Sequence, residues 1–359
     1  MVRLLLALVF MGWGSLALAA DQSWDELIAA AKREGKVVVI GPPDTVVRQT
    51  MPAAFKARFG VTMEYSGSLT GEQVAKLRLE RQAGLYTIDA VLTGSQSMAT
   101  IFYPGQLLEP IKPQLMLPEV LDGSKWVKGG PWFQDPEQQY VLRLSNSVLP
   151  SFFINTDIVK PQDLHLARNL LDAKWQGKIS SEDPATPGSG VNVAARFYLA
   201  FGEAGVKTLY VDHKPMIVRD ARQLTDWLLR GTYPIAFNVD KDQLEKMRKE
   251  GLPVKAIYEL PDFPAGIGAG QSLLGMMNHA PHPNAAKLFV NWIASKEGLE
   301  LYSRARSEAP TRTDIDAAKY LPAEVIPSAD GKYFDTYDWD FTVNTREKVR
   351  VYMKGLLGR

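Results

Sequence analysis

The sequence contains no cysteine among its 359 residues. This absence excludes a disulfide framework, a thiol nucleophile and cysteine-based metal ligation. It also excludes attachment of a lipid to a cysteine at the start of a processed chain. The fold must therefore depend on noncovalent packing, for which the 46% of hydrophobic residues can supply a large core.

An excess of charge of either sign is also lacking. The chain has 41 Lys plus Arg against 40 Asp plus Glu. Because Arg3 is the only charged residue among the first twenty, the chain without them is formally neutral. This balance does not predict binding to nucleic acid or to an anionic membrane surface. Beyond residue 20 we find no low-complexity segment, no fixed-period repeat and no apolar run long enough to span a bilayer.

The first twenty residues have the pattern of a secretory signal peptide. A short basic start precedes residues 4–18, which are almost wholly apolar, and Ala17-Leu18-Ala19 fits the small-x-small rule of a cleavage site. The apolar run is shorter than the roughly 20 residues that a spanning helix needs. We therefore expect residues 1–20 to be removed and the remaining chain to be a soluble periplasmic monomer that begins at Ala20 or Asp21.

Helical patterns alternate with short apolar runs along the rest of the chain. Ser23 opens a capping box ahead of an amphipathic helix, and residues 36–41 have the β-branched composition of a buried strand. Thr70 and Gln73 form a second capping box, and residues 89–94 follow as another strand. This alternation predicts an α/β fold with a mostly parallel sheet flanked by helices.

The alternation breaks at residues 140–158, where two extended segments surround a small polar middle. A second series of strands and helices follows, and the glycine-rich residues 266–277 predict a return strand through a hinge. We therefore expect two α/β lobes, which would close on a ligand between them. The predicted division is residues 21–145 for the first part of lobe 1, 146–270 for lobe 2, and 271–359 for a return to lobe 1 with C-terminal helical packing.

Three segments together resemble a known family. They are LLDAKWQGKI at residues 170–179, SSEDPATPGSG at residues 180–190, and NHAPHPNAAKLFVNWIASKEGLELYSRA at residues 278–305. The chain resembles the extracellular solute-binding proteins of ABC importers, family 1, and within them the ferric-iron-binding-protein-like cluster. The resemblance implies a two-lobed periplasmic-binding-protein fold of type II with hinge strands. It also implies one small solute, delivered to a membrane permease that a cytoplasmic ATPase drives.

One departure from that cluster concerns the ligand. Iron-binding members place two consecutive tyrosines after the strand that corresponds to residues 234–238, whereas this chain has Val239-Asp240 there. Tyr198 and Tyr233 remain as single tyrosines elsewhere. We therefore expect an organic ligand, with a small organic anion favoured and no metal or cofactor. Ferric iron held by a different ligand set and an organic cation, such as a polyamine or a thiamine-like molecule, are the alternatives.

The ligand-binding residues can be predicted from the positions of the strand ends. In open α/β sheets ligands bind beyond the carboxyl ends of strands, where helix N-termini offer unpaired N–H donors. The small residues of ATPGSG, 185–190, allow the closest backbone approach, and Arg219 could clamp a carboxylate or phosphonate. Asp44 and Asp240 could attract a cation, but helix capping is the favoured role for both. Helix capping is the alternative role for Thr70, and a surface ion pair is the alternative for Arg219. The predicted ligand-binding residues are Pro43, Asp44, Ser66, Ser68, Thr70, Thr93 and Ser95 in lobe 1, and Thr186, Gly188, Ser189, Gly190, Arg219, Arg222, Asn238 and Asp240 in lobe 2.

The sequence also lacks recognisable catalytic and metal-binding motifs. The sequence has no GxSxG elbow, no GxxxxGK[ST] phosphate loop and no HExxH. Its four histidines show no metal pair at helical spacing, so we expect them in solvated loops: His165, His213, His279 and His282. A binding protein rather than an enzyme is therefore favoured. An exported enzyme on the same fold and a periplasmic sensor are the alternatives from other classes.

Overall fold

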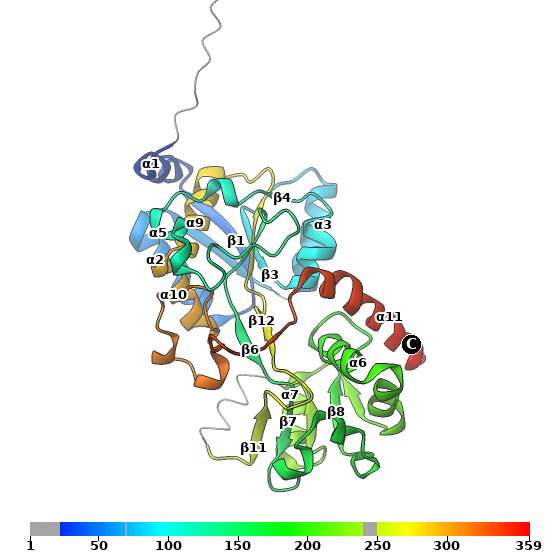
Figure 1. Cartoon of the computed structure of the whole chain (residues 1–359). Helices are drawn as coiled ribbons and strands as arrows, with labels where there is room; N and C mark the ends of the chain where they lie inside the picture. Colours follow the sequence, from blue (N-terminus) through cyan, green and yellow to red (C-terminus); the bar gives the residue numbers. More distant parts are fainter. Residues whose placement is uncertain (1–21, 69, 240–249) are drawn as a thin grey trace, which may run out of the picture.

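The computed structural model describes residues 22–68, 70–239 and 250–359. It shows two lobes, each built on a sheet with helices on its faces, connected by extended strands (Figure 1). The predicted signal peptide and Asp240 lie outside the described residues. Within the described part of the chain, no helix combines the length and the apolarity that crossing a membrane requires.

Lobe 1 is built on a six-stranded sheet in the order β2-β1-β3-β13-β4, with β5 also paired to β13. β1 is parallel to β2 and β3, whereas β13 is antiparallel to each of its neighbours. Five strands therefore run in one direction and β13 alone opposes them, as expected for a mostly parallel sheet. The strands are β1 (Lys36–Gly41), β2 (Thr62–Gly67), β3 (Ala90–Thr93), β4 (Leu108–Glu109), β5 (Val141–Arg143) and β13 (Leu273–Met277).

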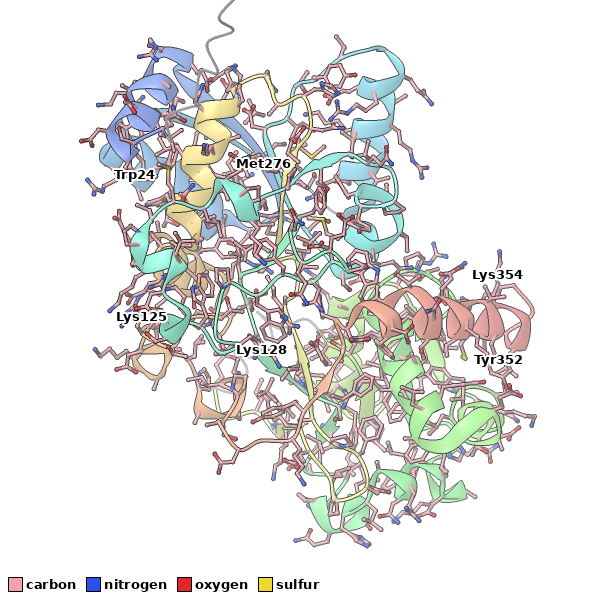
Figure 2. The ribbon with its side chains drawn as sticks, turned by 45° about the horizontal axis from the view of Figure 1, so that its top comes forward. Trp24, Lys125, Lys128, Met276, Tyr352 and Lys354 are labelled. Carbon is pink, nitrogen blue, oxygen red and sulfur yellow. The ribbon has the colours of Figure 1, made fainter. Side chains whose placement is uncertain are left out.

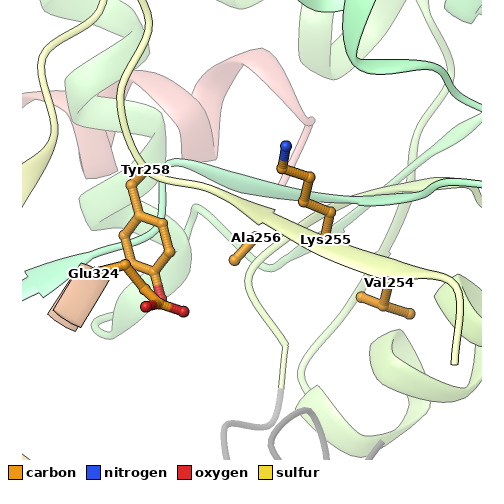
Figure 3. A pocket seen from close by; sticks show the side chains of 5 residues that line it. All are labelled: Val254, Lys255, Ala256, Tyr258 and Glu324. Carbon is orange, nitrogen blue, oxygen red and sulfur yellow. The ribbon is translucent and has the colours of Figure 1, made fainter. Parts of the chain in front are cut away.

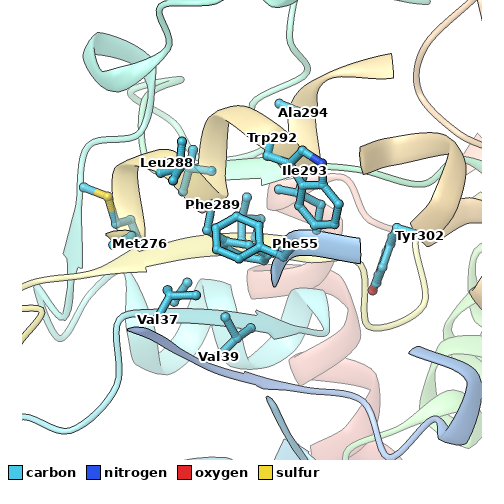
Figure 4. Packing of buried hydrophobic residues seen from close by; sticks show 14 of the residues in the cluster. Val37, Val39, Phe55, Met276, Leu288, Phe289, Trp292, Ile293, Ala294 and Tyr302 are labelled. Carbon is cyan, nitrogen blue, oxygen red and sulfur yellow. The ribbon is translucent and has the colours of Figure 1, made fainter. Parts of the chain in front are cut away.

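The helices of lobe 1 cover this sheet and enclose its core. The capping box predicted at Ser23 is present, and the helix after it ends at Gly35 in a left-handed conformation. The motif after residue 278 forms two helices whose apolar side chains enter this core. Phe55 lies between Phe289 and Trp292, with ring centroids 6.1 and 5.3 Å away (Figure 4). The helices are α1 (Trp24–Glu34), α2 (Thr45–Phe59), α3 (Thr70–Gln82), α4 (Ser95–Ser97), α5 (Pro118–Leu121), α9 (Pro283–Ala294) and α10 (Lys296–Arg306).

Lobe 2 is built on a five-stranded sheet in the order β11-β7-β10-β8-β9. β8 is parallel to β9 and β10, and β7 alone runs against the others. Its core contains Phe197 of α6, whose ring lies 4.9 Å from that of Phe237. The elements are β7 (Phe152–Asn155), β8 (Ile179–Glu182), α6 (Ser189–Lys207), β9 (Met216–Val218), α7 (Ala221–Arg230), β10 (Ile235–Phe237) and β11 (Val254–Ile257).

Three short strands cross between the lobes. β6 (Ser147–Leu149) and β12 (Gly266–Gly268) are antiparallel, and β14 (Phe334–Asp335) is parallel to β12. The first two correspond to the two predicted crossings, whereas the third was not predicted. The return strand predicted over residues 266–277 is divided into β12 and β13. The two strands are separated at Gly270, which has a positive φ of 53°.

The C-terminal segment differs from the expectation that residues 271–359 return to lobe 1. α9 and α10 do so, but α11 (Arg346–Leu356) packs on α6 of lobe 2. Val349 and Met353 are buried in the core of that lobe. Tyr352 faces α6 and Lys354 lies on the opposite side of the helix (Figure 2). An apolar stripe on a helix predicts burial, but it does not identify the partner.

Shorter helical turns connect these elements. They are Met98–Phe102, Lys112–Gln114, Gly123–Lys125, Pro161–Leu164, Ala167–Leu171, Ala173–Trp175, Thr208–Asp212, Ala317–Lys319, Ala323–Val325 and Phe341–Thr345.

Candidate functional site

The carboxyl ends of the parallel strands in both lobes lie toward the crossing strands. In lobe 1, Thr93 at the end of β3 pairs with Leu273, the first residue of β13 after the crossing. In lobe 2, Ala236 of β10 pairs with Phe153, near the start of β7 and shortly after the other crossing. Since β13 and β7 both lead away from the crossings, the loops after β3 and β10 begin on the hinge side. Both lobes therefore present strand-end loops where a ligand of a two-lobed protein would bind.

The loops after β1 and β2 are held together by one buried glutamine. Gln73 donates from Nε2 to the carbonyl oxygens of Gly41 and Ser68, at 2.9 and 3.1 Å. The Ser68 N–H also donates to Gly41 O at 3.0 Å. Gln73 therefore ties the ends of β1 and β2 to each other, whereas the capping box predicted for α3 also involves the side chain of Thr70, which lies outside the described part of the structure. The predicted residues Pro43 and Ser66 are exposed at this edge.

Asp44 caps α2, which is the structural role that the sequence allowed for it. Its Oδ1 accepts from two backbone N–H groups of the first turn. Its Oδ2 forms an ion pair with Arg306 at 3.1 Å, and Arg306 also contacts Glu308 at 2.9 Å. Burial alone would lower the pKa of Arg306, but the neighbouring Glu308 and Asp44 raise it above its ordinary value. The charge of Asp44 is therefore compensated within lobe 1.

The loop after β3 is occupied by the C-terminal segment. Thr93 and Ser95 are both buried. Arg346, at the start of α11, donates to Ser95 Oγ and to Gln96 Oε1, both at 3.0 Å. Burial lowers the pKa of Arg346, and its Nε has no partner among the described residues. This arginine links the loop of lobe 1 to a helix that packs on lobe 2, and the sequence did not suggest it.

The glycine-rich loop of lobe 2 leads directly into α6. Gly188 has a φ of 149°, and a Cβ on Gly190 would lie 2.7 Å from the carbonyl oxygens of Glu182 and Asp183. Only glycine fits at residue 190 without displacing backbone. Thr186 donates its hydroxyl to Asp183 O at 3.2 Å, which closes the turn. Gly188 and Ser189 are exposed at the helix start, whereas Gly190 is buried.

A carboxylate that was not predicted lies at this helix start. Glu182, the last residue of β8, accepts from the Ser189 hydroxyl and from the Asn238 amide, each at 2.5 Å. Asn238 also donates to Ser189 Oγ at 3.0 Å. The structure thus brings two predicted residues together through Glu182. The rule that selected the other strand-end residues applies equally to Glu182, so it could have been found.

Arg219 is mostly exposed and borders the same loop. Its Nε contacts Asp183 Oδ2 at 3.4 Å, and 76% of its side chain is exposed. Asp183, which is 2% exposed, also pairs with Arg359 at 2.7 Å. Arg219 therefore makes the ion pair that was its alternative role, yet most of its side chain stays accessible. Arg222 is exposed on the first turn of α7.

Two predicted residues cannot be placed in the site. The Thr70 side chain is not described, although α3 begins at Thr70. Asp240 lies outside the described residues.

The histidines differ in part from the expectation of solvated loops. His165 and His279 are exposed. His213 is buried and contacts the carbonyl oxygen of Leu170, and His282 pairs with the buried Asp89 at 2.9 Å. Loop position in a sequence does not reveal such tertiary partners. Among the described residues no group of three or more His, Asp or Glu is arranged to hold a metal ion.

A separate pocket of about 300 Å³ lies at the edge strand of lobe 2 (Figure 3). Tyr258 and Glu324 lie next to each other there, and Lys255 points to the opposite side of β11. This pocket contains none of the strand-end residues and is not a candidate for the predicted ligand site. Its lining residues are Val254, Lys255, Ala256, Tyr258 and Glu324.

Several solved structures are similar to this one over nearly the whole chain. Iron-bound HitA from Pseudomonas aeruginosa is similar at a TM-score of 0.66 with 14% identity, over 89% of this chain and 99% of that one. AfuA from Actinobacillus pleuropneumoniae, with bound fructose-6-phosphate, is similar at 0.63 with 20% identity, over 90% and 99%. IdiA (FutA) from Trichodesmium, in complex with iron and citrate, is similar at 0.64 with 14% identity, over 90% and 99%.

These identities establish the shared fold rather than a shared ligand. No curated protein matches the chain. The family model described as bacterial extracellular solute-binding protein matches residues 50–328, which is most of the sequence. The two lobes, the three crossing strands and the facing strand-end loops agree with that description. The chain therefore belongs to the bacterial extracellular solute-binding proteins.

Proposed function

We propose that this protein captures a small organic anion between its lobes in the periplasm and delivers it to an ABC permease. The observation that carries the ligand class is the exposed glycine-rich start of α6, bordered by the largely exposed side chain of Arg219. Helix N-termini and arginines favour anions without requiring a net positive charge on the protein. Ser68 and the start of α3 would contribute donors from lobe 1.

Glu182 restricts which anions could bind at the start of α6. Its carboxylate already accepts from Ser189 and Asn238 at the N-terminus of α6. A bare anion at this position would be repelled by Glu182, whereas a ligand with hydroxyl groups can donate to it. We therefore favour an anion that also carries hydrogen-bond donors. One structural neighbour, AfuA, has bound fructose-6-phosphate, which is a ligand of this chemical type.

An organic cation is the second candidate. Glu182 and Asp183 place two carboxylates beside the loop, and these would attract a polyamine or a thiamine-like ligand. Arg219 and Arg359 oppose this, because both guanidiniums contact Asp183. Ferric iron is the third candidate, since two neighbours were solved with iron.

A thermal-shift panel distinguishes these candidates. It would contain sugar phosphates, simple carboxylates and phosphonates, polyamines, thiamine and ferric citrate. We expect stabilisation by hydroxylated anions. Calorimetry should then show that Arg219→Ala weakens binding by roughly ten- to a hundredfold, because a charge-assisted hydrogen bond is lost. Arg230→Ala is the matched control, since Arg230 is also exposed and pairs with an acid, Asp226. Stabilisation by cations or iron alone would refute the anion proposal.

The cellular setting can be tested separately. We propose cleavage that leaves Ala20 or Asp21 as the first residue and a monomer without enzymatic activity. Intact-mass measurement of periplasmic material would reveal a retained leader, and light scattering would reveal an oligomer. Import and sensing share the same binding step, so uptake of the identified ligand by cells lacking the protein separates the two roles.

A further inference from the structure

A second pocket, of about 370 Å³, opens on lobe 1. None of its lining residues belongs to the strand-end loops. Glu137 is the single charged residue among them, and no lysine or arginine contributes to the lining. The lining residues are Tyr103, Pro104, Gln106, Leu108, Glu137 and Tyr140.

Two tyrosine rings form the aromatic walls of this pocket. The ring centroids of Tyr103 and Tyr140 are 5.7 Å apart, and the ring planes meet at 73°. This angle makes a corner rather than a stack: the two rings contact each other edge to face, and both border the pocket. Trp339 lies edge-on to Tyr103 at 5.2 Å and supports that ring. Leu108, which is buried, supplies an apolar surface beside the rings.

Glu137 supplies the charge of the pocket. Its Oε1 accepts from the Tyr103 hydroxyl at 2.7 Å. Burial and the contact with Glu137 raise the pKa of Tyr103 to about 12, so its hydroxyl stays protonated at neutral pH. Glu137 is exposed, and no other described residue that lines the pocket carries a charge.

The loop that carries Glu137 and Tyr140 is held in place by a buried carboxylate. Asp135 is 2% exposed and accepts from the backbone N–H groups of Gln139, Tyr140 and Val141, at 3.1, 3.0 and 2.9 Å. The N–H groups of Ile111 and Lys112 both donate to Gln139 O. The walls are therefore formed before any ligand binds, which lowers the ordering cost of binding.

We propose that this pocket is a second ligand site that binds a small organic cation, with a quaternary ammonium group against the rings of Tyr103 and Tyr140 and its charge balanced by Glu137. Ring faces carry partial negative charge and attract cations, and a quaternary ammonium is recognised by such aromatic surroundings. The carboxylate excludes anions from the same space. The site is therefore selective for a charge opposite to that of the solute proposed between the lobes.

Calorimetric titration of the full mature chain with choline and with tetramethylammonium tests this site. We expect saturable one-to-one binding that Trp339 fluorescence also reports, because its ring touches Tyr103. Glu137→Gln should weaken binding about tenfold, and Tyr140→Leu should weaken it similarly. Glu109→Gln is the control, since Glu109 is an exposed acid on the adjacent strand and does not line the pocket.

Several outcomes would overturn the proposal. They are equal affinity in wild type and Glu137→Gln, unchanged affinity in a folded Tyr140→Leu variant, or no saturation by either cation. Displacement of choline by the solute bound between the lobes would show that the cation occupies the main site instead. Because Arg219→Ala should leave choline binding unchanged, failure of this proposal is distinguishable from failure of the proposed function.

Discussion

Glu182 is the residue that most constrains the proposed ligand. Its carboxylate lies at the N-terminus of α6, where the helix dipole favours negative charge, and it engages the side chains of Ser189 and Asn238. The same position would suit an anionic group of the ligand. An anion that binds here must therefore either keep its negative group away from the Glu182 carboxylate or donate a hydrogen bond to it. This requirement would favour anions that carry hydrogen-bond donors.

A Glu182→Gln variant tests this selection. We expect its affinity for inorganic phosphate to rise several-fold, because Glu182 would no longer compete for the helix start, where one negative charge is stabilised by about 0.3–1 kcal/mol. Affinity for a hydroxylated phosphate should rise less or fall, since the neutral amide is a weaker acceptor for its hydroxyl groups. Calorimetry with both ligands gives the ratio of their affinities in the wild type and in the variant. Glu203→Gln, which changes an exposed acid elsewhere on α6, is the control, and an unchanged ratio would contradict the role of Glu182.

Gly190 fixes the entrance of the chain into α6. A Cβ there would lie 2.7 Å from two carbonyl oxygens, so Gly190→Ala should lower the free energy of unfolding by about 1–3 kcal/mol through overpacking. Gly355→Ala is the contrasting variant, because the added Cβ on α11 would have no atom within 4 Å. That change should raise stability by up to about 1 kcal/mol. Urea denaturation measures both, and equal effects would show that the contact at Gly190 relaxes at no cost.

At the scale of elements, short-range signals were sufficient for most helices and strands. The capping box at Ser23, the strand of residues 36–41 and the start of α6 could be predicted because each depends on neighbours in sequence. Long-range choices could not be predicted. Gln73 matched a capping pattern, yet it spans two strand ends, and the position of α11 on α6 depends on a third crossing through a two-residue strand.

The features of the candidate site likewise fall into those that the local sequence predicts and those that depend on distant segments. The strand-end rule located the loops, and the sequence motif located the glycine-rich turn into α6. The charged partners came from distant segments, as with Arg306 beside Asp44 and Arg346 beside Ser95. Such partners cannot be predicted from the sequence, because the residues near each charged side chain give no information about which distant residue it contacts.

The hydrogen bond from Arg346 to Ser95 connects α11 to lobe 1. Ser95→Ala removes the acceptor of a buried guanidinium N–H, so we expect a loss of about 1–3 kcal/mol in the free energy of unfolding. Amide hydrogen exchange in the first turn of α11 should also become faster. Thr100→Ala changes an exposed hydroxyl nearby and serves as the control. Unchanged exchange in α11 would show that its packing on α6 alone holds the segment.

At the scale of the whole molecule, the crossings determine how the lobes can move. Three strands join them, and Arg143 of lobe 1, which is fully buried, pairs with Asp335 of the third strand at 2.8 Å. Gly270 adjoins this region with a positive φ, and its carbonyl oxygen accepts from the Tyr337 hydroxyl. We therefore expect any rotation of the lobes to be concentrated at these short, well-anchored segments.

Ligand-driven closure is the prediction that follows at this scale. A ligand that contacts loops of both lobes favours the closed arrangement only through its higher affinity for that arrangement. Small-angle scattering at saturation should therefore show a smaller radius of gyration than the unliganded protein. Arg219→Ala should reach the same compaction at roughly ten- to a hundredfold higher ligand concentration, because it weakens binding without altering the crossings. Choline, which we place in a pocket within lobe 1, should bind without compaction. A radius that stays constant with a saturating solute would show that the lobes are already closed or that the solute contacts one lobe alone.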